Sequence, residues 1–290
     1  MPELPEVEIT ARRLHAALAG AGVESAMATG VATLKTFRPP LDDLAGMRVT
    51  GVNRRGKMLE VGFAGPDSVG PDRRLSLLLH LMSAGRLQLF EKRASLRDRR
   101  SRVLVRLADG RELRLREFGT RQSAWAKLLD TREVEQDEMV ATLGPDAWPA
   151  PPLEELTERI LQPRHLHPLL RDQRVIAGIG RSWVDEILWE AKLSPFKKGA
   201  ELRGEEIKRV HEALHVLGDA IEHYEEVVAE AVPDKMPMPL RVHRREGEPC
   251  PRCGTTIEAV FFAEHQMNYC PEEQTGGRVL KDRRLSRLLK

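Results

Sequence analysis

The chain changes its hydrophobic pattern at a proline-rich stretch, and this change limits the folds that its 290 residues can adopt. Before the stretch, residues 46–125 form short apolar or alternating blocks separated by Gly and Asp-Gly turns, which is typical of an antiparallel sheet. Residues 145–152 hold four prolines and predict a linker. Residues 153–232 then repeat apolar side chains at helical spacing. The expected strand blocks are Leu59–Phe63, Leu75–Leu81, Leu87–Phe90, Val103–Leu107 and Leu113–Leu115.

Charge is unevenly distributed along the chain. The net charge of +2 is too balanced to indicate a polyanionic partner by itself. Residues 92–116, however, hold ten Lys or Arg against three Asp or Glu, whereas residues 201–235 hold four basic against ten acidic side chains. The basic segment 92–116 therefore suits a polyanionic partner. No apolar run reaches the ~18 residues of a membrane span and no signal peptide begins the chain, so we expect a cytoplasmic protein without a membrane partner.

The three cysteines lie close together near the end of the chain. Cys250 and Cys253 form a Cys-x2-Cys knuckle followed by Gly254, and Cys270 begins a second Cys-Pro turn at hairpin distance. Their odd number and spacing favour a metal site over disulfides, and three thiolates suit zinc. The sequence therefore predicts one Zn²⁺ in a zinc ribbon.

The first residues, Met1-Pro2-Glu3-Leu4-Pro5-Glu6-Val7-Glu8, place a proline where removal of Met1 would make it the N-terminus. Pro2 would then be a secondary amine with an ordinary pKa of roughly 8, partly neutral near pH 7 and able to attack an electrophilic carbon. Glu3 is placed to handle protons. The same residues also suit a plain helix start, because Pro5 fits a first turn and Glu6 complements its positive end.

Taken in order, four motifs resemble the Fpg/Nei family of DNA glycosylases, which remove oxidised bases. They are the N-terminal octapeptide, Lys57 in Arg54-Arg55-Gly56-Lys57, the two-glycine stretch ending at Gly180, and the cysteine ribbon. The resemblance implies an α+β multidomain fold. Its parts are an N-terminal β-sandwich flanked by helices (residues 1–133), a helix-two-turn-helix domain (150–235) and a zinc ribbon with a basic tail (241–290), with DNA bound in the cleft between.

The resemblance implies a bifunctional DNA glycosylase and AP lyase of base excision repair. Pro2 would attack C1′ of the damaged nucleotide and form a Schiff base, and β,δ-elimination would cut the strand on both sides. Glu3 would aid proton transfer, Glu6 would support the site, and Lys57 would contact the phosphate of the damaged nucleotide. Without the resemblance, a solvated surface side chain is the better explanation of Lys57, because basic residues in loops are mostly solvated.

The resemblance also assigns DNA contacts, and several of them depart from the family pattern. Met82, Arg116 and Phe118 would form the wedge, the side chains that fill the space left by a flipped base, although Met82 is shifted by one position and core packing remains an alternative. Gly180 and Arg181 would hold phosphates, with arginine in place of the usual asparagine. His167 stands where lysine is common, and His265 stands in place of a minor-groove arginine. Grip on DNA should therefore be weaker or pH-dependent.

The zinc ligands implied by the resemblance are Cys250, Cys253, Cys270 and, in place of a fourth cysteine, Glu273. His265 or water in the fourth position, or loss of the metal, are the alternatives. The expected partner of this monomer is double-stranded DNA with an oxidised base or abasic site, at the nucleoid in a bacterium.

The preferred lesion and the presence of catalysis stay open. Residues 220–240 do not resemble the flexible loop that covers oxidised guanine in the guanine-directed branch of the family. This difference favours oxidised pyrimidines or abasic sites as the lesion. A catalytically inactive binder of damaged DNA is the alternative suggested by the changed grip positions. A general nucleic-acid zinc-ribbon protein would leave the first eight residues without a role.

Overall fold

In this computed structural model the chain forms two compact units. Unit 1 comprises Met1–Thr142 and Ile221–Pro237, and unit 2 comprises Leu143–Ala220 and Met238–Lys290. The structure describes all residues except 30–31, 66–72, 96–97, 120–122, 263–264 and 281–290, and it places no side chain for residues 262–265.

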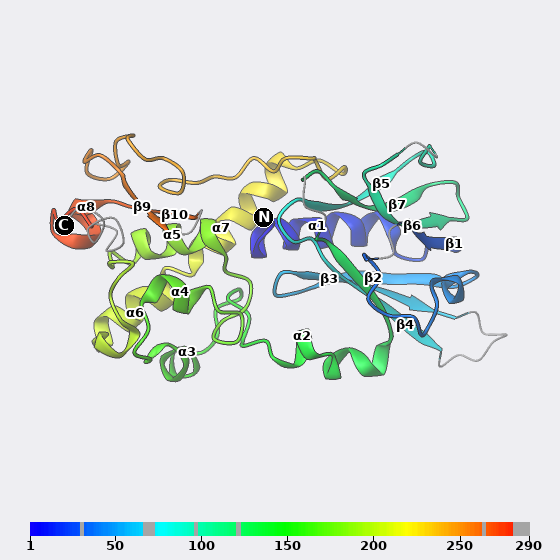
Figure 1. Cartoon of the computed structure of the whole chain (residues 1–290), viewed down its shortest axis with the longest axis horizontal. Coiled ribbons are helices and arrows are strands. Elements are labelled where there is room, and N and C mark those ends of the chain that lie inside the picture. Colours follow the sequence, from blue (N-terminus) through cyan, green and yellow to red (C-terminus); the bar gives the residue numbers. More distant parts are fainter. Residues whose placement is uncertain (30–31, 66–72, 96–97, 120–122, 263–264, 281–290) are drawn as a thin grey trace. The chain divides into compact units, whose positions relative to one another are not determined.

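Unit 1 is a sandwich of two four-stranded antiparallel sheets with the helix α1 (Leu4–Leu18) beside them (Figure 1). Leu14 of the helix, Val61 of one sheet and Val105 of the other belong to a single buried apolar cluster, so the two sheets share one core. One sheet has the order β1 (Val23–Ala28), β6 (Ser101–Leu107), β7 (Glu112–Glu117), β5 (Gly85–Phe90). The other has the order β2 (Arg48–Arg55), β3 (Met58–Ala64), β4 (Arg74–His80), β8 (Trp125–Asp130). Among its described residues the unit also has the short helical segments η1 (Leu41–Leu44), η3 (Thr131–Gln136) and α2 (Glu138–Ala141).

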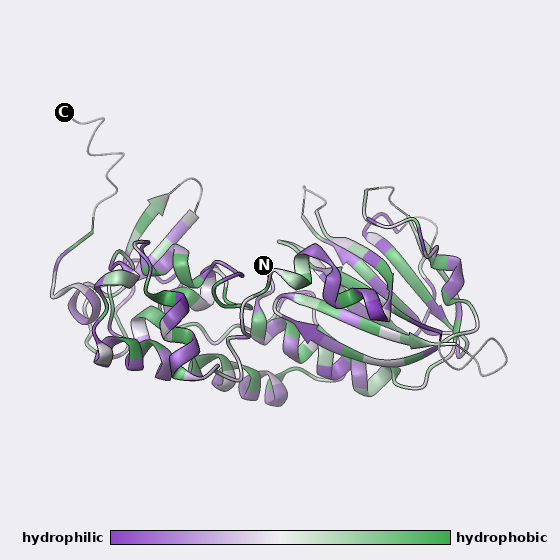
Figure 2. Cartoon of the chain, turned by 90° about the horizontal axis from the view of Figure 1, so that it is seen from below, coloured by the Kyte–Doolittle hydropathy of each residue, from purple (hydrophilic) through white to green (hydrophobic). Residues whose placement is uncertain are grey.

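The strands form because apolar and polar side chains alternate along them, as Figure 2 shows by colour. In β7, Leu113 and Leu115 enter the core while Arg114 and Arg116 lie on the opposite face. The five expected blocks lie in β3 to β7. β2 lies within the expected sheet region 46–125 although it is none of these blocks, whereas β1 lies outside that region and β8 begins only at its end. The missed edge strand β1 has the sequence Val-Glu-Ser-Ala-Met-Ala, whose small and charged side chains give little hydrophobic signal.

Unit 2 is helical up to the zinc-ribbon region. Helix α7 (His215–Val227) begins in unit 2, but its residues from Ile221 onward belong to unit 1. The other helical elements are α3 (Leu153–Ile160), α4 (Leu166–Leu170), α5 (Arg181–Glu190), η4 (Gly199–Glu201) and α6 (Gly204–Glu212). The hairpin of β9 (Glu258–Phe262) and β10 (His265–Tyr269) follows, and α8 (Pro271–Thr275) begins directly after Cys270. Across the residues that the structure describes, none of the helices has the length and apolarity needed to cross a membrane.

Candidate active site and metal cluster

The N-terminal residues are buried at the start of α1. Pro2 is buried, and Glu3 and Glu6 are only 1% and 3% exposed. The backbone N–H of Glu3 donates to Oε2 of Glu6 at 2.9 Å, which satisfies a donor at the helix start and fixes the residue that follows Pro2. The plain helix start therefore applies to Glu6, and its functional role stays a prediction. A carboxylate this deeply buried needs hydrogen-bond donors, and the second one comes from a distant helix.

Tyr224 of α7 supplies that second donor. Its hydroxyl donates to Oε1 of Glu6 at 2.7 Å across 218 positions of sequence. Burial and the negative charge of Glu6 both raise the pKa of Tyr224, so it remains a protonated donor at any physiological pH. The direction of the Glu6 carboxylate is thus held from two elements of unit 1, and no sequence pattern indicated Tyr224.

Lys57 lies in the tight turn between β2 and β3. Gly56 takes the left-handed conformation there, with φ of 55°, so the turn needs glycine. Lys57 is only 8% exposed, so the alternative of an ordinary solvated lysine is wrong. The neighbouring Arg54 pairs with Glu8 of α1 at 2.8 Å, which ties this turn to the helix that carries the N-terminal residues.

His80 at the end of β4 is a candidate site residue that sequence reasoning missed. Burial and the positive charge of Lys57 lower its pKa to about 4, so the imidazole is neutral near pH 7. Nδ1 accepts a hydrogen bond from the backbone N–H of Met82 at 2.9 Å, so the neutral ring carries its proton on Nε2. The ring stacks on Trp125, with 5.7 Å between centroids. The only sequence signal was its place in the stretch that precedes Met82.

The turn from β4 to β5 places Met82. Its φ of 48° is unusual for a residue with a side chain, and the bond to His80 helps to hold it. Gly85 closes the turn, because a Cβ there would lie 2.4 Å from the carbonyl oxygen of Leu81. Met82 is half-buried rather than part of the core.

Arg116 and Phe118 lie at the end of β7 in the same unit. Phe118 is half-buried, and the Arg116 guanidinium lies 4.8 Å from its ring centroid. The Arg116 side chain is 15% exposed and lies against the sheet, where Nη1 donates to Oε1 of Gln88 at 3.0 Å. Neither side chain belongs to the buried apolar core.

In unit 2, Gly180 precedes the first residue of α5, and Arg181 opens the helix. The turn before it needs glycine at Gly178, whose φ is 99°. Gln173 holds this turn, since its Oε1 accepts from the N–H of Gly178 at 2.9 Å and its Nε2 donates to the carbonyl of Ile179 at 2.9 Å. The expected helix opening after two glycines is thus present.

His167 has a role within unit 2 that its sequence position did not suggest. It is 5% exposed, and its Nε2 lies 3.2 Å from Oδ1 of Asp185. The other oxygen of Asp185 is 2.7 Å from Nδ1 of His243 and accepts the N–H of Asn268 at 2.9 Å. The adjacent Glu186 accepts three backbone N–H groups of residues 241–243 at 2.8–3.0 Å. These acids join α5 to the segment before the ribbon.

The three thiols form a compact cluster. The sulfur atoms of Cys250, Cys253 and Cys270 lie within 4.8 Å of one another. Burial and the neighbouring thiols raise the pKa of Cys270 to about 12, which a cation in the cluster would reverse. The residues present therefore fit one Zn²⁺. The fourth proposed ligand, Glu273, lies 3.3 Å from Arg252 and 3.4 Å from Lys192, and the group of potential ligands found in the described part of the chain consists of the cysteines alone.

Comparison with known proteins identifies all three parts of the chain. The family models that match are the formamidopyrimidine-DNA glycosylase N-terminal domain (residues 1–121), its H2TH domain (143–231) and the zinc finger found in FPG and IleRS (247–272). The formamidopyrimidine-DNA glycosylase of Geobacillus kaustophilus is 33% identical over 290 residues, which is 94% of this chain and 100% of that protein. An uncharacterized formamidopyrimidine-DNA glycosylase-like protein of Mycobacterium tuberculosis is 47% identical over 123 residues, which is 42% of this chain and 78% of that protein.

Solved structures agree with this result. The complex between Lactococcus lactis Fpg and DNA containing an abasic site superposes with a TM-score of 0.82 at 27% identity, covering 94% of this chain and 99% of that one. The fold and the site define a DNA glycosylase with AP lyase activity that acts in base excision repair. The chain belongs to the formamidopyrimidine-DNA glycosylase (Fpg/Nei) family, as the resemblance implied.

Proposed function

We propose that Pro2, after removal of Met1, is the nucleophile, that Glu3 moves protons, and that Glu6 and Lys57 support them. The observation that carries this proposal is the arrangement at the start of α1, where Glu6 fixes the N–H of Glu3 and is itself fixed by Tyr224. Because Glu3 is fixed, it keeps the amine of the adjacent Pro2 in one orientation, which lowers the entropic cost of attack on C1′.

In the proposed reaction the Pro2 nitrogen forms a bond to C1′ of the nucleotide as the bond from C1′ to the base breaks, or the bond to the hydroxyl group at an abasic site, and the amine loses its proton. The C1′–O4′ bond then breaks as Glu3 delivers a proton to O4′, and the product is a cationic iminium. This electron sink makes the C2′ proton acidic, so a base can remove it while the 3′-phosphate leaves, and a second elimination releases the 5′-phosphate. Water then hydrolyses the iminium and restores the amine.

Lys57 is proposed to hold the phosphate of the damaged nucleotide, since a buried lysine gains from an anionic partner. His80 adds a neutral N–H donor near the positive charge of Lys57. Because His80 stays neutral near pH 7, it adds a hydrogen bond without adding charge.

Met82, Arg116 and Phe118 are proposed as the wedge, and Gly180, Arg181 and His265 as contacts to the DNA backbone or groove. The His265 side chain lies outside the described ones. We propose functional domains at residues 1–133, 150–235 and 241–290, although the compact units divide the chain differently by grouping Ile221–Pro237 with unit 1.

For the metal we propose Cys250, Cys253 and Cys270 as ligands and Glu273 as the fourth. When bound, zinc would join the knuckle to the turn at Cys270 and so hold the ribbon together. For the lesion we propose oxidised pyrimidines or abasic sites over 8-oxoguanine. A DNA substrate of this kind places the enzyme in the cytoplasm, at the nucleoid in a bacterium.

Borohydride trapping tests the proposal. Purified protein is incubated with duplexes that hold an abasic site, 8-oxoguanine or an oxidised pyrimidine, and the adduct is quantified beside a Pro2→Gly variant. We expect an adduct with the wild type and at least about a hundredfold slower trapping with the variant. Binding in gel shifts without any adduct would overturn the proposal in favour of an inactive binder of damaged DNA.

A further inference from the structure

Guanidinium and phenyl groups alternate along the face of the β6–β7–β5 sheet that points away from the core. The guanidinium carbon of Arg114 lies 4.1 Å from the ring centroid of Phe90, and that of Arg116 lies 5.2 Å from the same ring. Arg116 also lies 4.8 Å from the ring of Phe118, and Arg100 lies 5.1 Å from it. We call these side chains the Arg–Phe row: Arg114, Phe90, Arg116, Phe118, Arg100.

Two guanidinium groups of the row, those of Arg116 and Arg100, lie near the Phe118 ring. Each contact is attractive, and together they restrict the χ1 and χ2 rotation of the ring. Phe118 would otherwise be a half-buried ring at the end of a strand, free to change rotamer. Its position therefore depends on Arg116, whose own position needs an anchor.

Gln88 and Asp234 anchor Arg116 by hydrogen bonds. Arg116 Nη1 donates to Oε1 of Gln88 at 3.0 Å and to Oδ1 of Asp234 at 3.3 Å. Nε2 of Gln88 donates to Oδ1 of Asp234 at 3.0 Å and to the carbonyl of Val232 at 2.7 Å. Gln88 is 6% exposed and its bond to Val232 is buried, whereas the bond from Arg116 to Asp234 lies at the exposed edge of this group. One amide thus connects the guanidinium, the carboxylate and a second backbone segment.

Asp234 comes from a part of the chain that is remote in sequence. It lies in residues 228–237, which follow α7 and belong to unit 1. Arg86 of β5 adds a further bond to this segment, because its Nε donates to the carbonyl of Asp234 at 2.9 Å. Three donors on β5 and β7 therefore bind residues 228–237, and two of the acceptors belong to the same residue.

We propose that Gln88 and Asp234 are positioning residues for Arg116 and Phe118, so that residues 228–237 set the placement of the wedge. The inference rests on the proposed wedge function of Arg116 and Phe118. It assigns Gln88 and Asp234 to the step in which a base leaves the helix and its partner is left unpaired, and it gives them no part in the amine chemistry of Pro2. Single-stranded DNA has no partner base, so it needs the amine and not the wedge.

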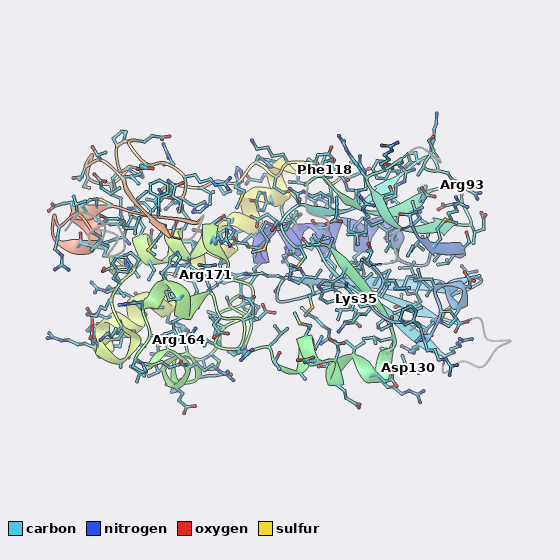
Figure 3. The ribbon with its side chains drawn as sticks, viewed as in Figure 1. Lys35, Arg93, Phe118, Asp130, Arg164 and Arg171 are labelled. Carbon is cyan, nitrogen blue, oxygen red and sulfur yellow. The ribbon has the colours of Figure 1, made fainter. Side chains whose placement is uncertain are left out.

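The test compares Gln88→Leu and Asp234→Asn on two abasic substrates under single-turnover conditions. One is a duplex with the abasic site opposite each of the four bases in turn, and the other is the single-stranded oligonucleotide. We expect cleavage of the duplex to slow about tenfold and the ranking of opposite bases to flatten, while trapping on the single strand stays within about twofold. Asp109→Asn and Glu24→Gln are the matched controls. Asp109 lies in the β6–β7 turn, and Glu24 of β1 pairs with Arg93, which lies at the other end of this sheet from Phe118 (Figure 3).

Each outcome decides the proposal. Equal losses on duplex and single strand would assign Gln88 and Asp234 a merely structural role, and unchanged duplex cleavage would remove them from wedge placement. Thermal unfolding of each variant shows whether it is folded. A wild type that forms no adduct on either substrate would instead overturn the proposed function, and that result differs from both.

Discussion

Two buried acids, Glu6 of unit 1 and Asp185 of unit 2, have different kinds of partner. Glu6 accepts hydrogen bonds from the backbone N–H of Glu3 and the hydroxyl of Tyr224. Asp185 lies between the imidazoles of His167 and His243. A neutral donor fixes the direction of a carboxylate without neutralising it, whereas an imidazole neutralises it when protonated. At these two residues the difference separates a carboxylate that orients the residue after Pro2 from one that joins segments of unit 2.

The largest expected effect comes from removing a ligand of the metal cluster, and this effect should be confined to unit 2. Cys270→Ser should lower zinc affinity at least a hundredfold, at about 1.4 kcal/mol per factor of ten, because a thiolate ligand is lost. Zinc retained against a competing chelator measures this, and trapping on single-stranded abasic DNA should be kept. Glu273→Gln is the companion variant. If it retains zinc as tightly as the wild type, Glu273 leaves the proposed ligand set.

Asp185 tests the acids that hold segments of unit 2 together. Asp185→Ala should lower the free energy of unfolding by about 4 kcal/mol, because the buried imidazole of His243 and the N–H of Asn268 lose their acceptor and the buried His167 loses the carboxylate beside it. Urea unfolding followed by fluorescence measures the change. Asp219→Asn removes an exposed partner of His215 and should cost less than about 0.5 kcal/mol. Equal costs for both variants would contradict the proposed role of Asp185.

The pH dependence of unit 1 should depend on His80. Its pKa is lowered from 6.5 to about 4 in the folded state, so the unfolded state binds more protons between these values and stability falls as the pH falls. Between pH 7.5 and 5 the wild type should lose about 2 kcal/mol more than His80→Asn, which does not titrate. If the wild type and His80→Asn lost the same stability over this pH range, a group other than His80 would account for the pH dependence.

The smallest effect concerns the donor to Glu6. Tyr224→Phe should cost about 1 kcal/mol, because one oxygen of a buried carboxylate loses its donor while the ring still fills its space. Chemical denaturation gives the stability, and borohydride trapping shows whether the orientation of Glu6 affects the amine. A variant as stable as the wild type would mean that another group replaces the hydroxyl.

Local patterns predicted much of this molecule. Pro5 and Glu6 predicted the start of α1, and the blocks Val103–Leu107 and Leu113–Leu115 predicted two central strands. The knuckle at Cys250 and Cys253 predicted a cluster with Cys270. His80 escaped notice because a histidine at a strand end has no distinctive pattern. Its lowered pKa arises from burial and from Lys57, which lies in the turn before the neighbouring strand β3.

The sequence by itself determined the elements, the order of the parts, the family and the residues available for chemistry, since these depend on neighbours a few positions apart. Only the tertiary structure decided which polar groups share a hydrogen bond. Tyr224 meets Glu6 across 218 positions, and Asp234 meets Gln88 across 146. Such pairs form because a buried polar atom must find a partner, and packing alone decides which distant segment supplies it.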